Sequence, residues 1–117
     1  MADHIHTFDP GAKITCAAGA DVIGGRVVKV TGDREVSHAT AAADVVFGVA
    51  ARDTKDGEDV LVLRGGVQNL IASGAITAGA RVVAAAAGKV ATATEGGFGT
   101  ALTTVTAADQ PVQIALD

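Results

Sequence analysis

Short apolar runs separated by glycine-containing turns occur along most of this chain, and they predict β-strands. In the segment 26–31, Val28 and Val30 fall on one face and the residues between and beside them on the other. The segment 112–116 alternates more clearly, and its three large aliphatic side chains are expected to point inward. Because side chains of a strand point alternately to its two faces, each segment is expected to bury one face. Many such runs in succession predict an all-β fold, a small sandwich or barrel with short turns.

The remaining predicted strands are 44–52, 60–64, 67–72, 81–86, 89–94 and 101–106. The first of these is apolar on both faces and is expected to be a central strand. Asp56-Gly57 predicts the turn of a hairpin, because glycine tolerates the positive φ that such turns require. Gly65-Gly66 is either a tight turn or a bulge in one long strand. At most one short helix is expected, a single alanine-rich turn at 39–43.

The chain is predicted to form one β-rich domain at 14–117, preceded by an extended N-terminal arm at 1–13. The arm contains a Pro10-Gly11 turn signal and no sustained hydrophobic period. A chain of 117 residues buries roughly 65% of its unfolded surface, enough for one modest core. Because Trp and Tyr are absent and Phe occurs three times, this core is expected to be thin, so association with other subunits would add stability.

Two similar segments are consistent with an internal duplication. Residues 18–22 and 29–30 match residues 78–82 and 89–90 at a constant offset (79 − 19 = 60). Each copy is expected to form a turn followed by two strands. A duplicated unit and a chance match between abundant Ala, Gly and Val residues are both open at this point.

Charge and composition exclude several classes of partner. The net charge is −4 and the nine basic residues are scattered, whereas phosphate binding requires clustered Lys and Arg, so no nucleic-acid partner is expected. The longest aliphatic run, 82–87, is far shorter than the roughly 20 residues of a membrane span, so no membrane partner is expected. The N-terminus lacks the pattern of a secretion signal, which predicts folding in a cytoplasm.

Candidate catalytic groups are few and poorly placed. Ser37 and His38 are sequence neighbours whose side chains would point to opposite faces of a strand, so a triad is not expected. Cys16 is alone, which excludes an intrachain disulfide. A concealed acid–base pair of His38 and Glu35 is the remaining enzyme hypothesis. The sequence therefore predicts no enzyme, and no catalytic or cofactor-binding residue is assigned.

Metal and phosphate sites are not predicted either. His4 and His6 could chelate a cation, but no further Cys or His completes a structural set of ligands. The acids of 53–59 lack the spacing of a calcium loop and are expected to form a solvated hairpin tip. The glycine-rich segment 95–100 lacks the lysine of a phosphate-binding loop and is expected to be a surface loop. Its Phe98 either enters the core or anchors a partner.

Four turn-and-strand motifs, at 48–52, 57–60, 63–67 and 77–82, carry a resemblance to a known family. The chain resembles the capsid cement proteins, or head decoration proteins, of tailed phages, notably those of actinobacterial siphophages. This resemblance implies a structural virion protein that binds the outer surface of the phage head. It would stabilise the capsid by bridging subunits of the major capsid protein, as a homotrimer at three-fold or quasi-three-fold positions. It implies no cofactor.

Similarity to the lambda-type decoration proteins extends this expectation to residues 2–13, which would meet the capsid lattice as an arm. The alternative function is a small β-rich binding or carrier module without catalysis. A carrier displays a modifiable lysine on a hairpin tip. Lys29 and Lys89 fall within predicted strands instead, and Lys55 lacks flanking apolar residues.

Overall fold

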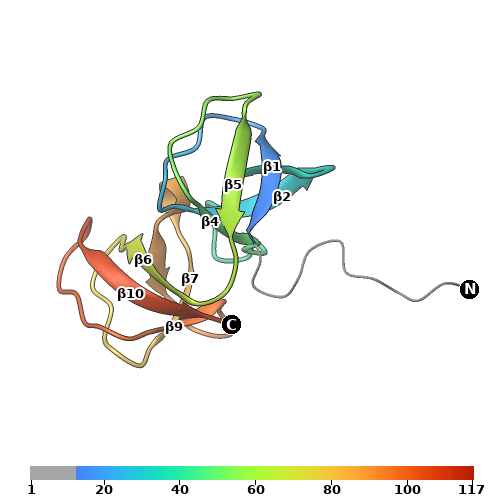
Figure 1. The fold of residues 1–117 in the computed structure, drawn as a ribbon. Coiled ribbons are helices and arrows are strands. Elements are labelled where there is room, and N and C mark those ends of the chain that lie inside the picture. The colour runs from blue at the N-terminus through green and yellow to red at the C-terminus, as the bar shows by residue number, and fades with distance from the viewer. Residues whose placement is uncertain (1–12) are drawn as a thin grey trace, which may run out of the picture.

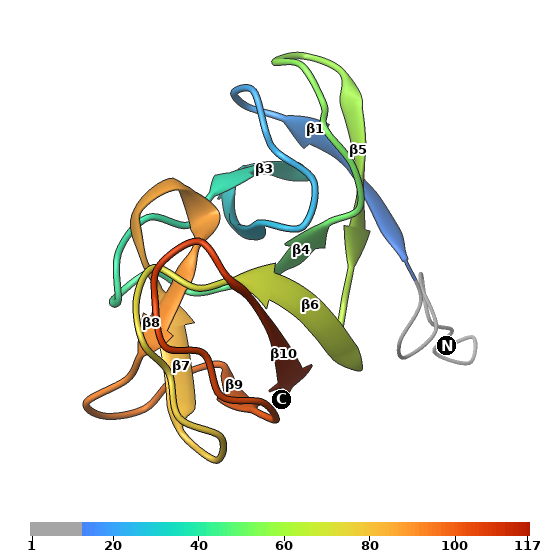
Figure 2. The same cartoon turned by 90° about the vertical axis from the view of Figure 1, so that its left-hand side faces the viewer.

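The protein is all-β, as the sequence predicts, and its described residues form ten strands (Figures 1 and 2). A computed structural model describes residues 13–117, and the predicted arm lies outside the described residues except for Lys13. The helical part of this range is confined to the 3-10 turn η1 (Ala86–Gly88). The strands are β1 (Ile14–Ala18), β2 (Val27–Gly32), β3 (Glu35–His38), β4 (Gly48–Ala50), β5 (Asp59–Leu63), β6 (Val67–Ile71), β7 (Arg81–Ala84), β8 (Val90–Thr92), β9 (Gly99–Ala101) and β10 (Pro111–Leu116).

The first five strands form a closed barrel in the order β1-β3-β2-β4-β5. β5 runs antiparallel to β1 with Val62 opposite Ile14, and β3 runs parallel to β1 on its other side with Val36 opposite Ala18. We call residues 14–64 the first half, and they occupy the upper part of Figure 1. Closure of the barrel pairs its strand edges, which would otherwise be free to join strands of other chains.

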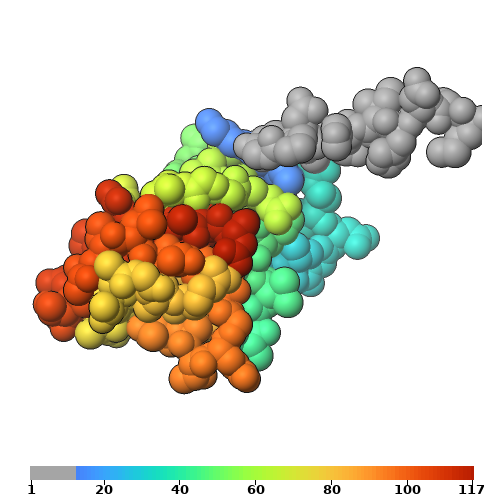
Figure 3. Space-filling model, turned by 90° about the horizontal axis from the view of Figure 1, so that it is seen from below, coloured from blue at the N-terminus to red at the C-terminus, as the bar shows by residue number. Residues whose placement is uncertain are grey.

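The last five strands form a second sheet in the order β6-β10-β9-β7-β8. Its two outer strands meet at a parallel bridge between Ala72 and Val90, so this sheet also curls back on itself. We call residues 65–117 the second half. The space-filling view shows the two halves packed side by side as one continuous body (Figure 3).

The two halves repeat one topology, so the chain is a structural duplication. β1 to β5 correspond in order to β6 to β10, and each strand pairing of the first half has a counterpart in the second. The contact Ala18–Val36 corresponds to Ala72–Val90, an offset of 54 residues (72 − 18 = 90 − 36 = 54). The predicted offset of 60 is wrong, because it aligned abundant small residues without the pairing that defines equivalence.

The duplication extends to individual close contacts. Gly48 of β4 and Gly99 of β9 are equivalent (99 − 48 = 51), because the loop before β9 is three residues shorter than the loop before β4. A Cβ on Gly48 would lie 2.6 Å from the Leu63 carbonyl oxygen, and one on Gly99 would lie 2.7 Å from that of Ala115. Both positions therefore require glycine, since the partner strand approaches too closely for a side chain.

Two clusters of buried aliphatic side chains form the core, and the larger one joins the halves. It includes Leu70 and Ile76 of the second half together with Val27 and Val49 of the first. The smaller cluster fills the barrel and includes Val28. Because adjacent valines of β2 point into different clusters, this strand is buried on both faces where the halves meet. The halves therefore pack as one body around a shared core.

The strand predicted at 26–31 is present as β2, but the burial of its faces differs from the prediction. Val28 is fully buried, whereas Val30, expected on the same face, is 54% exposed. Val30 begins an exposed run, residues 30–34, that forms the end of the β2–β3 hairpin, and the register with β3 shifts within this end. In β10, Val112 and Ile114 are buried as predicted, and Leu116 is partly buried.

The helix predicted at 39–43 is wrong, and this segment is an irregular turn. The Asp44 carboxylate accepts hydrogen bonds from the Thr40 N–H at 2.8 Å and the Ala41 N–H at 3.1 Å. It also accepts a hydrogen bond from Lys29 Nζ at 3.2 Å. A side chain that satisfies backbone donors in this way favours a turn over a helix, whatever the propensity of the alanines.

Three predicted strands are shorter than expected by three residues or more, at 44–52, 101–106 and 89–94, the last of which is reduced to β8. The first is reduced to β4, which is buried and central as predicted. The second is replaced by β9, which ends at its first residue, and Val105 then forms a single bridge with Ile76. Gly65-Gly66 joins the two halves as a turn rather than a bulge, since β5 and β6 belong to different sheets.

Candidate binding surfaces

The residues considered for catalysis do not assemble into a reactive site. His38 Nε2 accepts a hydrogen bond from the Ile23 N–H at 2.9 Å, so this nitrogen is already engaged. Burial, together with the positive charge of Arg26, lowers the pKa of His38. Glu35 accepts a hydrogen bond from Thr31 Oγ1 at 3.1 Å and not from His38. The His38–Glu35 pair therefore gains no support from the structure.

Hydrogen bonds to carboxylates connect the predicted hairpin tip with the neighbouring turn. Asp53 Oδ1 accepts a hydrogen bond from the Gly24 N–H at 2.8 Å. Asp21 Oδ1 accepts one from the Asp56 N–H at 2.9 Å. These two hydrogen bonds join the turns of the first half, although the residues that they link are 29 and 35 positions apart in the sequence.

Metal ligands are not gathered in the part of the chain that the structure describes. Within residues 13–117, no three His, Cys, Asp or Glu side chains lie close enough together to hold a metal ion. His4 and His6 lie outside the described residues. Cys16 is a free, buried thiol inside the barrel.

The glycine-rich segment 95–100 is a surface loop folded around the side chain of Arg81. The guanidinium donates hydrogen bonds to the Gly97 carbonyl and to Thr100 Oγ1, both at 3.0 Å, and to the Asp117 carboxylate. A phosphate-binding loop points N–H groups at an anion, whereas this loop points carbonyl oxygens at a cation. The hydrogen bond from Arg81 also lowers the pKa of Asp117.

An exposed apolar surface lies along the seam between the two halves. Phe98 is partly buried there against the larger core cluster, which favours core packing over a free anchor. Val45 beside it is 83% exposed, although it is a large aliphatic side chain. These residues border an open cavity of about 350 Å³. We call the accessible apolar side chains of its lining, Ala42, Val45, Val46, Val83 and Phe98, the seam patch. Asp44 and Glu95 also line this cavity.

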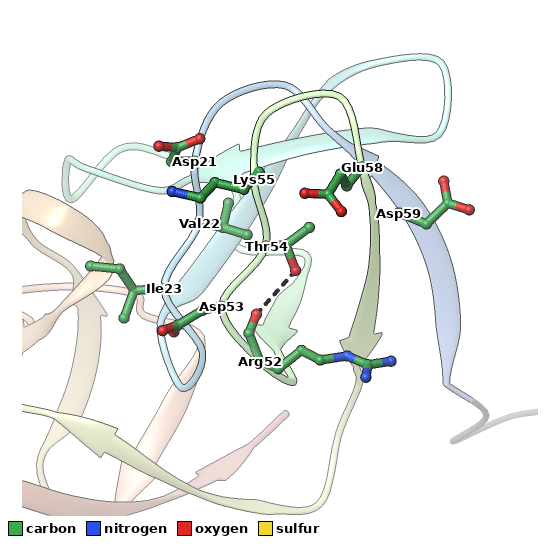
Figure 4. Close-up of a pocket in the computed structure, with 9 residues that line it drawn as sticks. All are labelled: Asp21, Val22, Ile23, Arg52, Asp53, Thr54, Lys55, Glu58 and Asp59. Carbon is green, nitrogen blue, oxygen red and sulfur yellow. Dashed lines mark hydrogen bonds between the residues drawn. The ribbon is translucent and has the colours of Figure 1, made fainter.

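A second hollow of about 470 Å³ lies on the first half, between the turn before β2 and the turn before β5 (Figure 4). The antiparallel bridge between Val22 and Thr54 forms its floor. The exposed side chain of Ile23 lies at its rim. We call this hollow the charged groove, because its walls carry the acids Asp21, Asp53, Glu58 and Asp59 and the bases Arg52 and Lys55.

Comparison with known proteins gives these surfaces a context. The family model of the phage cement proteins matches residues 5–116 of the sequence. The chain belongs to the phage cement protein family. Membership makes it a structural protein of the phage head, located in the virion capsid, and confirms the family resemblance found in the sequence.

A solved structure shares the fold of this cement-family protein. It is the crystal structure of the head fiber gp8.5 N base of bacteriophage phi29, with a TM-score of 0.76 and 23% sequence identity. The similarity covers 91% of this chain and 93% of the phi29 chain. No curated protein sequence matches. Within residues 13–117, no helix is long and apolar enough to cross a membrane.

The charged groove was not predicted from the sequence. The acids of 53–59 are a hairpin tip in sequence terms, and the groove arises because the turn that contains Asp21 packs beside that tip. A signal is nonetheless present in the sequence, because the second half lacks charges at the equivalent positions. Reading that signal requires the offsets that strand pairing defines, which are 54 residues at Asp21 and 51 or 52 residues over 52–59.

Proposed function

We propose that the protein binds the outer surface of the phage head and stabilises the capsid by bridging neighbouring subunits of the major capsid protein. It does so as a homotrimer at three-fold or quasi-three-fold positions, without catalysis and without a cofactor, after synthesis in the host cytoplasm. The observation that carries the proposal is the match of the cement-protein family model to residues 5–116. Residues 2–13 are proposed to contact the capsid lattice as an arm.

The shared fold supports attachment to a phage head. The phi29 chain with this fold is the N base of a head fiber. A fold that serves at such a base suits a chain whose two halves form one body, since a rigid body transmits load between the subunits that it contacts.

The distribution of charge supports a protein interface on the second half. This half carries five charged side chains, of which Arg81 pairs with Asp117 and Lys89 with Asp109. Glu95 is the one charge of this half without an ion pair among the described residues. Protein interfaces are depleted in charge at their centres. The charge-poor second half and the adjoining seam patch therefore form our candidate for the surface that faces the shell.

The carrier alternative is not favoured by the surroundings of Lys29 and Lys89. Lys29 Nζ lies 3.2 Å from the Asp44 carboxylate, and Lys89 pairs with Asp109. Lys89 also lies in the turn before β8 and not within a strand as predicted. Both lysines are engaged with carboxylates, whereas a carrier lysine must be free for modification.

Co-sedimentation of the purified protein with expanded, undecorated heads of its phage tests the proposal. Saturable pelleting with the heads is the expected result. Absence of pelleting at every salt concentration would contradict the proposal. A chain lacking residues 2–13 is expected to reach lower occupancy in the same assay, and undiminished occupancy would remove the arm from the proposal.

A further inference from the structure

The fold does not require the charges of the charged groove, because the second half has the same local fold without them. The floor of the groove, the bridge between Val22 and Thr54, recurs in the second half as the bridge between Ile76 and Val105. The strand pairings on either side fix which wall residues are equivalent. The groove residues Arg52, Lys55 and Glu58 correspond to Thr103, Thr106 and Gln110 of the second half.

One backbone hydrogen bond of the groove also forms in the second half, where its acceptor is an uncharged side chain. The Gly24 N–H donates to Asp53 Oδ1 at 2.8 Å in the first half. At the equivalent position, the Ala78 N–H donates to Thr104 Oγ1 at 2.9 Å. A neutral hydroxyl therefore satisfies this backbone donor in one half, so a carboxylate is not needed for it in the other.

Three other charged side chains of the groove have no partner among the described residues. Among the described residues, the side chains of Arg52, Lys55 and Glu58 form no ion pair and no side-chain hydrogen bond. Figure 4 shows the Glu58 carboxylate turned toward Thr54 over the groove, and Lys55 extended toward Asp21. Four acids and two bases leave the groove with a net charge of −2.

We propose that the charged groove holds a segment of the major capsid protein that presents a Lys or Arg side chain next to an apolar one. This inference rests on the proposed function. The carboxylates of Glu58 and Asp59 would accept charge-assisted hydrogen bonds from the cation. The side chain of Ile23, 45% exposed at the rim, would cover the apolar neighbour.

The unequal halves give this contact a consequence for assembly. Because the second half lacks the acids of the groove, the two halves do not offer the same site to the same capsid segment. A duplicated fold could otherwise bind in two orientations related by its internal repeat. The charged groove therefore selects one orientation of the protein on the shell.

Exchange of groove residues tests this proposal with variants that the fold accommodates. Glu58→Gln with Asp59→Asn removes two acids, and Arg52→Thr with Lys55→Thr removes the two bases. Three of these four changes install the residue found at the equivalent position of the second half. The matched control is Asp33→Asn, which removes an exposed acid of the first half that lines neither the groove nor the seam cavity.

The assay is co-sedimentation with expanded, undecorated heads over a range of salt, after circular dichroism has verified that each variant is folded. The acid-removing variant is expected to bind about ten-fold more weakly than the wild type, with a smaller dependence on salt. The base-removing variant is expected to bind as tightly as the wild type or more tightly. The Asp33→Asn control is expected to bind as the wild type does.

The possible failures separate the groove from the cement function. Wild-type affinity in the acid-removing variant would overturn the groove assignment and leave the cement function standing. Weaker binding by the base-removing variant alone would also overturn it, because that result indicates an acidic occupant. Absence of wild-type pelleting would contradict the proposed function, and the groove assignment would fall with it.

Discussion

Small side chains control how closely the strands of this protein approach one another. Among the described residues, the largest fully buried side chains are Leu70, Ile76 and Ile114, followed by a set of valines, and neither Phe47 nor Phe98 is fully buried. Strands of such a core lie close together, and Gly48 and Gly99 mark the two places where they come closest to a partner strand without a Cβ between. Substitution of these glycines therefore tests how closely the strands approach one another.

Gly48→Ala is expected to lower the free energy of unfolding by about 1–3 kcal/mol, because overpacking of a tight contact costs that much. The added Cβ would lie 2.6 Å from the Leu63 carbonyl oxygen. Gly74→Ala is the matched control, since nothing lies within 4 Å of a Cβ at that position. Urea unfolding followed by circular dichroism measures both changes. Equal unfolding midpoints for the two variants would contradict the close approach of β4 and β5.

The ion pair of Arg81 with Asp117 is expected to make part of the free energy of unfolding depend on pH in the acid range. Its hydrogen bond lowers the pKa of Asp117 below the ordinary value of 3.8. A carboxyl whose pKa is lower in the folded state stabilises the fold above its unfolded pKa, and this contribution is lost as the pH falls through the folded pKa. The pair is exposed, so the effect is small.

Thermal unfolding of the wild type and Asp117→Asn across the acid range measures this contribution. The difference in Tm is expected to stay constant from neutral pH down to about pH 5 and to shrink below 3.8. Asp44 and Asp109, whose pKa values are also lowered, are present in both proteins and cancel from the difference. A difference that persists unchanged to about pH 2 would contradict the pairing.

At the scale of elements, the sequence locates strands better than it locates their ends. β5, β6 and β10 lie within two residues of their predicted positions, because large aliphatic residues mark them and turn residues bound them. β9 ends earlier than predicted because its Thr-rich continuation suits a strand or a loop equally. β4 begins later than predicted because residues 44–47 belong to the loop whose backbone N–H groups the Asp44 carboxylate binds. The turn at 39–43 depends on the Asp44 carboxylate, which helix propensity does not register.

The candidate surfaces are harder to predict from the sequence than the strands are. The seam patch and the charged groove each combine residues from segments far apart in the chain. The glycines around Phe98 leave a core contact and a partner anchor both open, and its partial burial against the larger core cluster favours the core contact. Val45 was expected within a central strand, and its 83% exposure follows from the loop that replaces the start of that strand.

The loop before β4 provides a test of the seam patch. Val45→Asp is expected to weaken binding to expanded heads by about ten-fold, because a charge would enter an apolar interface. Stability is expected to change little, since this side chain is already exposed. Val30→Asp is the matched control, because Val30 is 54% exposed and does not line the seam. Equal loss of binding in both variants would contradict a specific role for the seam patch.

At the scale of the whole molecule, the shared core makes the two halves one unit of stability. The larger cluster contains buried residues of both halves, including Val27 and Leu70. Each half repeats the same strand pairing, yet neither contains all the side chains that cover its own sheet. The halves are therefore expected to unfold together in a single transition.

Leu70→Ala measures this cooperativity. The variant is expected to lose about 2–5 kcal/mol of unfolding free energy, because Leu70 is fully buried in the shared cluster. Amide NMR signals from β1–β5 and from β6–β10 are expected to disappear at the same urea concentration. First-half signals that survive after the second half has unfolded would contradict a single cooperative unit.

Cryo-electron microscopy of expanded heads saturated with the protein reports directly on its position in the virion. We predict density on the outer surface at three-fold or quasi-three-fold positions, with each copy in contact with at least two subunits of the major capsid protein. The second half and the seam patch are expected to face the shell. Density on the inner surface, or copies that each contact a single capsid subunit, would contradict capsid stabilisation by bridging.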